Sequence, residues 1–119
     1  MWITTQHGHI SVVADPISPQ RVIMRAHRFE HIRELIPEAD IWQLPRYERG
    51  DPFGEHDYYY RAVVQKSRFQ QAVAEQIDAL PLGTFRHHIA DPVYYDACNR
   101  AKRELYRTDL TKHHSLFDD

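Results

Sequence analysis

The most strand-like run of aromatic and apolar residues lies in the middle of the chain, from Asp57 to Gln65. If this segment is extended, one face carries Tyr58, Tyr60, Ala62 and Val64, and the other carries Tyr59, Arg61 and Val63. Aromatic and β-branched residues at a two-residue period are typical of a β-strand. The pattern therefore predicts a central antiparallel strand, with one face packed by helices and the other accessible to solvent or a partner.

Shorter extended segments precede this strand, at residues 2–6, 10–14 and 21–27. The first two flank His7-Gly8-His9, whose glycine permits a tight reversal of the chain. The next connection, residues 15–19, contains two prolines and other turn-forming residues. The three segments are therefore predicted to form a meander, in which each strand pairs with the next.

The period of the apolar residues changes to three and four residues in the helical segments. Residues 29–36 are predicted to form a short amphipathic helix, which Pro37 ends. Ser67 and Gln70 match a capping box, and the apolar stripe beside them consists of Phe69, Ala72, Val73, Ile77 and Leu80. This stripe predicts a helix over residues 67–80 that is buried against the sheet.

A last helix is expected to begin at Asp91-Pro92, which fit an N-cap and a first-turn residue, and to end near Arg107. Its apolar face carries Tyr94, Ala97, Cys98, Ala101 and Leu105. Residues 84–89 are a candidate for one further helical turn. The polar tail, residues 108–119, is expected to fray.

Together these elements predict an α+β fold: a mostly antiparallel sheet of four or five strands with about three helices on one face, in a two-layer sandwich. Residues 40–44 supply an edge strand in this scheme. Residues 46–56 show no periodicity, which makes this long loop a candidate functional element. A single domain is expected over residues 1–107, followed by the polar tail 108–119.

The composition is that of a globular protein, with 42% hydrophobic and 27% charged residues. The first residues lack the features of a signal peptide, and no apolar run reaches the ~18 residues of a membrane span. One cysteine excludes an internal disulfide, so we expect a cytoplasmic protein. The net charge of −2 argues against strong unspecific nucleic-acid binding, and no motif calls for a cofactor.

Several short motifs, spread over most of the chain, match a pattern shared by other proteins. They are Met1-Trp2 with Thr5, Gly8 and Ser11-Val12-Val13, then Met24-Arg25-Ala26, then Asp57-Tyr58-Tyr59-Tyr60-Arg61-Ala62. This pattern resembles a group of small bacterial and bacteriophage proteins with no known activity. The chain departs from that pattern at His9, where an aromatic residue is usual, and at residues 80–85. The resemblance implies a shared fold and a bacterial or phage-infected host cell, and it transfers no site.

Histidines supply the candidate acid–base or metal chemistry. His7 and His9 flank a glycine and could converge on a metal, or could act with Arg61 in a small metal-independent nuclease. The alternative is that they are polar surface residues, which we favour because nine histidines make close pairs frequent by chance. Cys98 lies on the apolar face of the last helix, so we expect a packed, inert thiol there.

Basic residues make nucleic acid an alternative ligand. Arg100, Arg103 and Arg107 share the face of the last helix opposite its apolar stripe, and Arg25 and Arg28 lie in and beside the third strand. Such residues near tyrosines can follow a phosphate backbone. On an ordinary solvated face, neighbouring acidic residues balance the same charges.

The leading hypothesis is a protein-contact surface. Tyr59 and Arg61 share one face of the predicted central strand, and Tyr47 and Phe53 lie in the candidate loop. Aromatic residues and arginine are enriched at protein interfaces, although core packing is the alternative for the tyrosines. We therefore expect a small intracellular interaction protein that binds a bacterial protein or self-associates. A nucleic-acid-binding protein or small nuclease is the alternative.

Overall fold

The computed structural model describes residues 1–44 and 58–117, with side chains described as far as residue 108. The chain divides into two compact units, residues 1–81 and 82–119. The first unit contains β1 (Trp2–Thr5), β2 (Gly8–Ala14), β3 (Arg21–Ala26), α1 (Phe29–Leu35), β4 (Trp42–Gln43), β5 (Tyr60–Gln65) and α2 (Lys66–Asp78). The second contains the short 3₁₀ helix η2 (Phe85–His88) and α3 (Pro92–Phe117).

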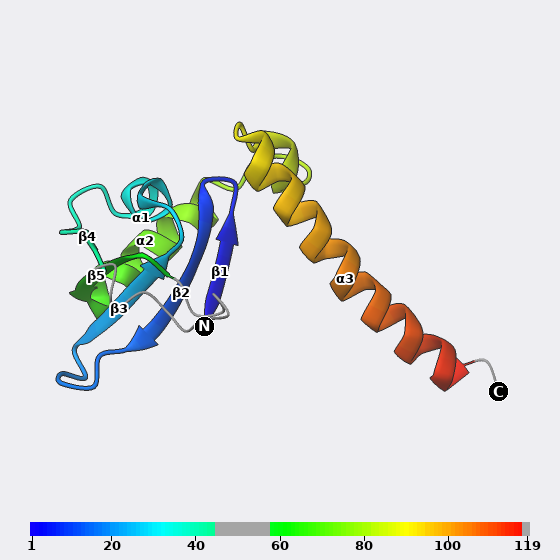
Figure 1. The fold of residues 1–119 in the computed structure, drawn as a ribbon, viewed down its shortest axis with the longest axis horizontal. Helices are drawn as coiled ribbons and strands as arrows, with labels where there is room; N and C mark the ends of the chain where they lie inside the picture. The colour runs from blue at the N-terminus through cyan, green and yellow to red at the C-terminus, as the bar shows by residue number, and fades with distance from the viewer. Residues whose placement is uncertain (45–57, 118–119) are drawn as a thin grey trace. The chain divides into compact units, whose positions relative to one another are not determined.

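The strands form one antiparallel sheet in the order β1-β2-β3-β5-β4 (Figure 1). The predicted meander is confirmed, because β1 pairs with β2 and β2 pairs with β3. The strand predicted from the alternating pattern is β5, which pairs with β3 on one side and with the two-residue β4 on the other. The α+β class and the five-stranded antiparallel sheet are thus as predicted, with β3 as the middle strand.

The turn of the first hairpin is shorter than predicted and comes earlier in the chain. Thr5 pairs with Gly8, so Gln6 and His7 form the turn and Gly8 is the first residue of β2. Gly8 is buried, and a Cβ added to it would lie 2.6 Å from Cβ of His31 in α1. The glycine therefore serves close packing of α1 on the hairpin and not the turn itself.

Helices α1 and α2 bury one face of the sheet. The core contains Ile10, Val12, Val22, Met24, Ala26 and Ala62 from the strands, Ile32, Leu35, Phe69 and Ala72 from the two helices, and Ile36 and Ala39 from the segment after α1. Met24 and Ile32 are fully buried, and each such side chain contributes about 1.5–3 kcal/mol. Tyr60 packs edge-on against Phe29, with ring centroids 6.1 Å apart. Tyr60, Ala62 and Val64 therefore face the helices as predicted, but Tyr58, predicted on the same face, lies before β5 and contacts Arg25 on the opposite face.

Helix α2 departs from the prediction at both ends. Its N-cap is Gln65, and no side chain caps the helix, so Ser67 and Gln70 do not form a capping box. Phe69 and Ala72 are buried and Val73 packs beside them, but Ile77 and Leu80 are 61% and 69% exposed. The core therefore covers only the first two turns of α2, and the predicted burial of Ile77 is wrong.

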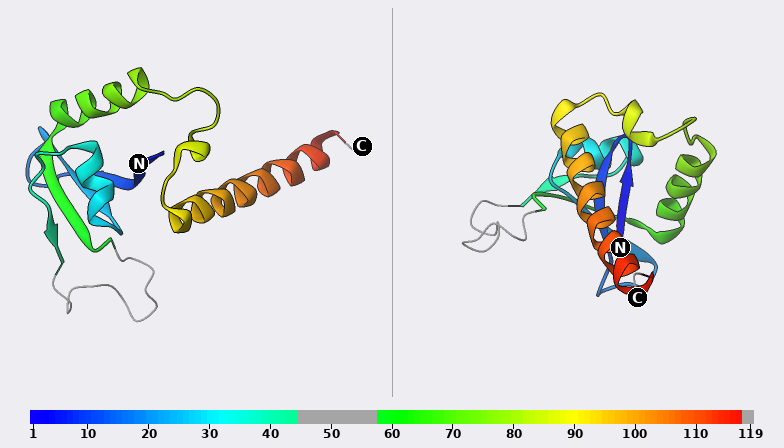
Figure 2. Two further views of the ribbon diagram at one scale, coloured as in Figure 1. Left: turned by 90° about the horizontal axis from the view of Figure 1, so that it is seen from above. Right: turned by 90° about the vertical axis from the view of Figure 1, so that its right-hand side faces the viewer.

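In the second unit, Asp91 caps α3 as predicted, because its Oδ1 accepts a hydrogen bond of 2.9 Å from the backbone N–H of Val93. Helix α3 forms one unbroken rod that continues to Phe117 (Figure 2). It is longer than predicted because residues 93–117 contain neither glycine nor proline. Cys98 is a buried free thiol, as predicted. Among the described helices, none combines the length and apolar character of a membrane span.

Candidate functional site

The face of the sheet opposite the core carries a row of residues that continues through all five strands. Residues paired across an antiparallel sheet point to the same face, and the register pairs these residues one to the next. The row consists of Trp2, Ser11, Arg25, Arg61 and Trp42. We call this row and the side chains that contact it the arginine face. Four strand spacings of about 4.8 Å make the row about 19 Å long.

Arg25 is held in place on the arginine face. Its Nη2 donates a hydrogen bond of 2.7 Å to Oγ of Ser11, which is itself only 1% exposed. Its Cζ lies 5.1 Å from the centre of the Tyr58 ring, within the range of a cation–π contact. The guanidinium is therefore fixed in orientation before any ligand arrives, which lowers the entropy cost of binding.

Arg61 lies directly opposite Arg25 in the neighbouring strand. Directly opposed like charges repel and destabilise a sheet. A sheet selected only for stability would place an apolar residue or an acid at one of the two positions. Two guanidinium groups held side by side are instead a suitable site for an anionic group, because each can donate two parallel hydrogen bonds to it.

Aromatic rings lie beside Arg25 and at both ends of the row. The His27 ring lies 4.7 Å from the ring of Tyr58 and 6.5 Å from the ring of Tyr59. At the two ends of the row, Trp2 is 74% exposed and Trp42 is 43% exposed. Flat exposed rings on both sides of a cationic centre can stack on planar groups of a ligand.

Charge is segregated between the two layers of the first unit. The acidic residues described there, apart from Asp15, belong to α1, α2 and the segment between α1 and β4: Glu30, Glu34, Glu38, Asp40, Glu75 and Asp78. Asp15 follows β2 and forms an ion pair of 3.0 Å with Arg21. None of the five strands contains an acidic residue. The net charge of −2 therefore does not describe the arginine face, whose strand residues are neutral or basic.

His9 lies on β2 near the end of the arginine face, packed edge-on against Trp2 at 5.7 Å. It shares a hydrogen bond of 2.8 Å with the Thr4 hydroxyl through Nδ1, and its backbone N–H donates to Nδ1 of His31 at 3.3 Å. Burial lowers the pKa of His9, and the neighbouring His27 lowers it further. The imidazole is thus neutral at pH 7 and engaged by its neighbours.

His7 and His9, predicted as a candidate metal or acid–base pair, each contact a different side chain. His7 lies in the β1–β2 turn, where its Nε2 is 3.3 Å from Nε2 of Gln6, while His9 and Arg61 lie on strands separated by β3. Within residues 1–44 and 58–108, no three His, Cys, Asp or Glu side chains come together as ligands for a metal ion. His9 and Arg61, which that hypothesis combines, lie on the same face of the sheet.

The other predicted site residues fall into three groups. Tyr59 and Arg25 lie on the arginine face, as does Arg61. Arg28 precedes α1, and Arg100, Arg103 and Arg107 lie on α3 in the second unit, where Arg107 pairs with Glu104 at 3.2 Å. Tyr47, Phe53 and the loop 46–56 are outside the described residues. Sequence reasoning missed Trp2, Ser11 and Trp42, because only the pairing register brings them into line with the arginines.

Comparisons with known proteins add nothing to this geometry. No protein-family model matches the chain, and neither does a curated protein or a solved structure. The function is therefore argued from the site alone.

Proposed function

We propose that the protein binds single-stranded nucleic acid on the arginine face. The observation that carries the proposal is the placement of Arg25 directly opposite Arg61, between exposed tryptophans, on strands without an acidic residue. Proteins that bind single strands combine cationic groups for the phosphates with aromatic rings on which bases stack. Sheets with aromatic residues on one open face are a recurrent platform for this task.

Each part of the arginine face has a role in this proposal. Arg25, oriented by Ser11 and Tyr58, and Arg61 beside it hold phosphate oxygens of one or two successive nucleotides. Trp2 and Trp42 stack on bases toward the two ends of the row, which is long enough for a short single-stranded segment. A duplex is excluded from such stacking because its bases are already paired and stacked.

Binding of a protein partner is the second candidate, and a neighbouring row on the same face favours it. Val13 pairs with Ile23 and Ile23 with Val63, and all three are half-buried. An apolar strip beside tryptophan, tyrosine and arginine has the composition of a protein interface. In this version the partner is a bacterial protein or a second copy of the chain, in the bacterial or phage-infected cell that the resemblance implies.

The test measures equilibrium binding of fluorescently labelled single-stranded RNA and DNA by anisotropy. Affinity should fall steeply between about 50 and 200 mM salt, because bound phosphates release counterions from the oligonucleotide. Trp42→Ala should weaken binding by about 1–3 kcal/mol through the lost stacking contact. Arg61→Gln should weaken binding and reduce the salt dependence.

The matched control is Arg33→Gln, which removes an exposed arginine of α1 on the other layer. It changes the net charge by the same amount as Arg61→Gln, so a general charge effect would weaken both variants equally. That equality, or the absence of binding at 50 mM salt, would remove the nucleic-acid proposal. Salt-resistant self-association that Trp42→Ala abolishes would support the second candidate instead.

A further inference from the structure

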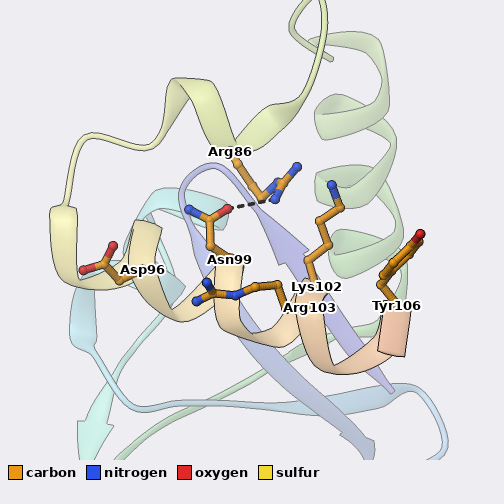
Figure 3. Close-up of a pocket in the computed structure, with 6 residues that line it drawn as sticks. All are labelled: Arg86, Asp96, Asn99, Lys102, Arg103 and Tyr106. Atoms are coloured by element: carbon orange, nitrogen blue, oxygen red, sulfur yellow. Dashed lines mark hydrogen bonds between the residues drawn. The ribbon is translucent and has the colours of Figure 1, made fainter. Parts of the chain in front are cut away.

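The second unit contains a cavity of about 470 Å³, and three of the six residues that line it are basic (Figure 3). Its lining residues come from η2 and the first half of α3: Arg86, Asp96, Asn99, Lys102, Arg103 and Tyr106. Three cations and one carboxylate give this lining a net charge of +2. A cavity of this size is within the usual range of sites for small molecules, about 300–1,000 Å³.

The helix spacing explains why these side chains meet. Asn99, Arg103 and Tyr106 follow one another at steps of four and three residues, which places them along one side of α3, with Lys102 beside them. Arg86 reaches the same place from η2, and its Nη1 donates a hydrogen bond of 2.8 Å to Oδ1 of Asn99. Asn99 thereby fixes the orientation of one guanidinium at the wall of the cavity.

Two of the cations have no partner of their own in the described part of the chain. Lys102 and Arg103 form no ion pair with another described residue, unlike Arg107, which pairs with Glu104. Asp96 lines the cavity from the side away from Lys102 and Tyr106 (Figure 3). An anion entering near Arg86 and Lys102 would therefore meet donors from two elements.

We propose that this cavity binds the terminal phosphate of a small phosphorylated molecule. A phosphate monoester carries close to two negative charges at pH 7, which matches the charge of the lining better than the single charge of a phosphodiester does. Arg86 and Arg103 donate in parallel to the phosphate oxygens, and Lys102 adds a point charge. The exposed ring of Tyr106 gives the rest of the ligand an aromatic surface, so a nucleoside monophosphate is a suitable probe.

This inference does not rest on the proposed function, because all the residues it uses lie in residues 82–119. The experiment titrates the full chain with adenosine 5′-monophosphate by calorimetry and by NMR. Binding should weaken by about 10-fold or more in Arg103→Gln, the value expected for loss of a charged hydrogen bond. Arg100→Gln is the matched control, since Arg100 is exposed on α3 and does not line the cavity. It should bind like the unmodified chain.

Two further ligands distinguish binding of a terminal phosphate from binding of a backbone phosphate. Adenosine without phosphate should not bind, and a short oligonucleotide lacking terminal phosphates should lose no affinity in Arg103→Gln. Equal binding of adenosine and its monophosphate would overturn the proposal, as would equal losses in Arg103→Gln and Arg100→Gln. Loss of oligonucleotide affinity in Arg103→Gln would also overturn it, because the cavity would then hold a backbone phosphate.

Discussion

Gly8→Ala tests the packing between the first hairpin and α1. A Cβ at this position would lie 2.6 Å from both Cβ and Cδ2 of His31 and closer still to Cγ. Non-bonded carbon atoms prefer separations of about 3.5–4.0 Å, so the distance between the added Cβ and His31 must increase by roughly an ångström. His31 cannot supply it by turning its ring alone, because its Cβ is fixed by the backbone of α1. We therefore expect the helix and the hairpin to move apart.

The magnitude follows from two opposing terms. Crowding of a packed core costs about 1–3 kcal/mol. Replacing glycine by alanine also restricts the unfolded chain, which stabilises by about 0.4–1 kcal/mol where the backbone conformation suits alanine. Gly8 meets that condition because its φ is not positive. The net expectation is a loss of about 1–2 kcal/mol in the free energy of unfolding, measured by urea denaturation.

The same substitution in a His31→Ala background identifies the cause. With the ring gone, the contacts with Cγ and Cδ2 disappear and only the contact with the Cβ at position 31 remains, so Gly8→Ala should cost less than it does with the histidine present. Gly83→Ala provides the opposite control: φ of Gly83 is +76°, and an added Cβ there has nothing within 4 Å. It should cost about 1–2 kcal/mol through backbone strain alone. A Gly8→Ala loss of equal size with and without the His31 ring would refute the packing argument.

Three further predictions concern stability. Ala72→Asp places a carboxylate in the core and should lower the free energy of unfolding, measured by urea denaturation, by several kcal/mol. Ile77→Asp, at a position that is 61% exposed, should change it by less than about 0.5 kcal/mol. Similar losses in the two variants would contradict the assignment of the buried face of α2. Burial lowers the pKa of His9 and of His31, so the unfolded chain binds these protons more readily than the folded protein. The stability that the two neutral histidines contribute should be complete above about pH 6.5 and should fall as the pH drops through the lowered pKa values. In thermal melts, His31→Gln should lose less stability between neutral and acidic pH than the unmodified chain does. Asp91→Ala removes the N-cap of α3, which should destabilise the helix by about 1 kcal/mol and reduce the helicity measured by circular dichroism. Unchanged helicity would contradict the capping contact.

Local periodicity was sufficient for the faces of the strands. The alternation in β5 correctly separates Tyr60 and Ala62, which pack on the helices, from Arg61 on the other face. Periodicity could not supply the register, since which residues pair depends on contacts between distant segments. For this reason the alignment of Trp2 with Trp42 through the two arginines was not predictable, although each residue was visible in the sequence.

The apolar stripes of the helices predicted which face is buried but not how far along the helix the burial continues. The stripe of α2 points Phe69 and Ala72 inward, yet Ile77 on the same stripe is exposed, because the opposing core ends before the last helical turn. For α3 the prediction instead ended the helix too early, near Arg107. Residues 108–117 are polar, which favoured a frayed tail, but they contain no helix breaker and continue the helix.

The most direct test of the arginine face uses the two tryptophans of the chain as reporters. Trp2 and Trp42 are its only tryptophans and lie at opposite ends of the row. Their indole N–H groups give two NMR signals, which single Trp→Phe variants assign. Titration with single-stranded RNA should shift both signals at low salt and leave the backbone signals of Phe69 and Ala72 on the helical layer unchanged. Two unmoved indole signals at saturating RNA would contradict the account.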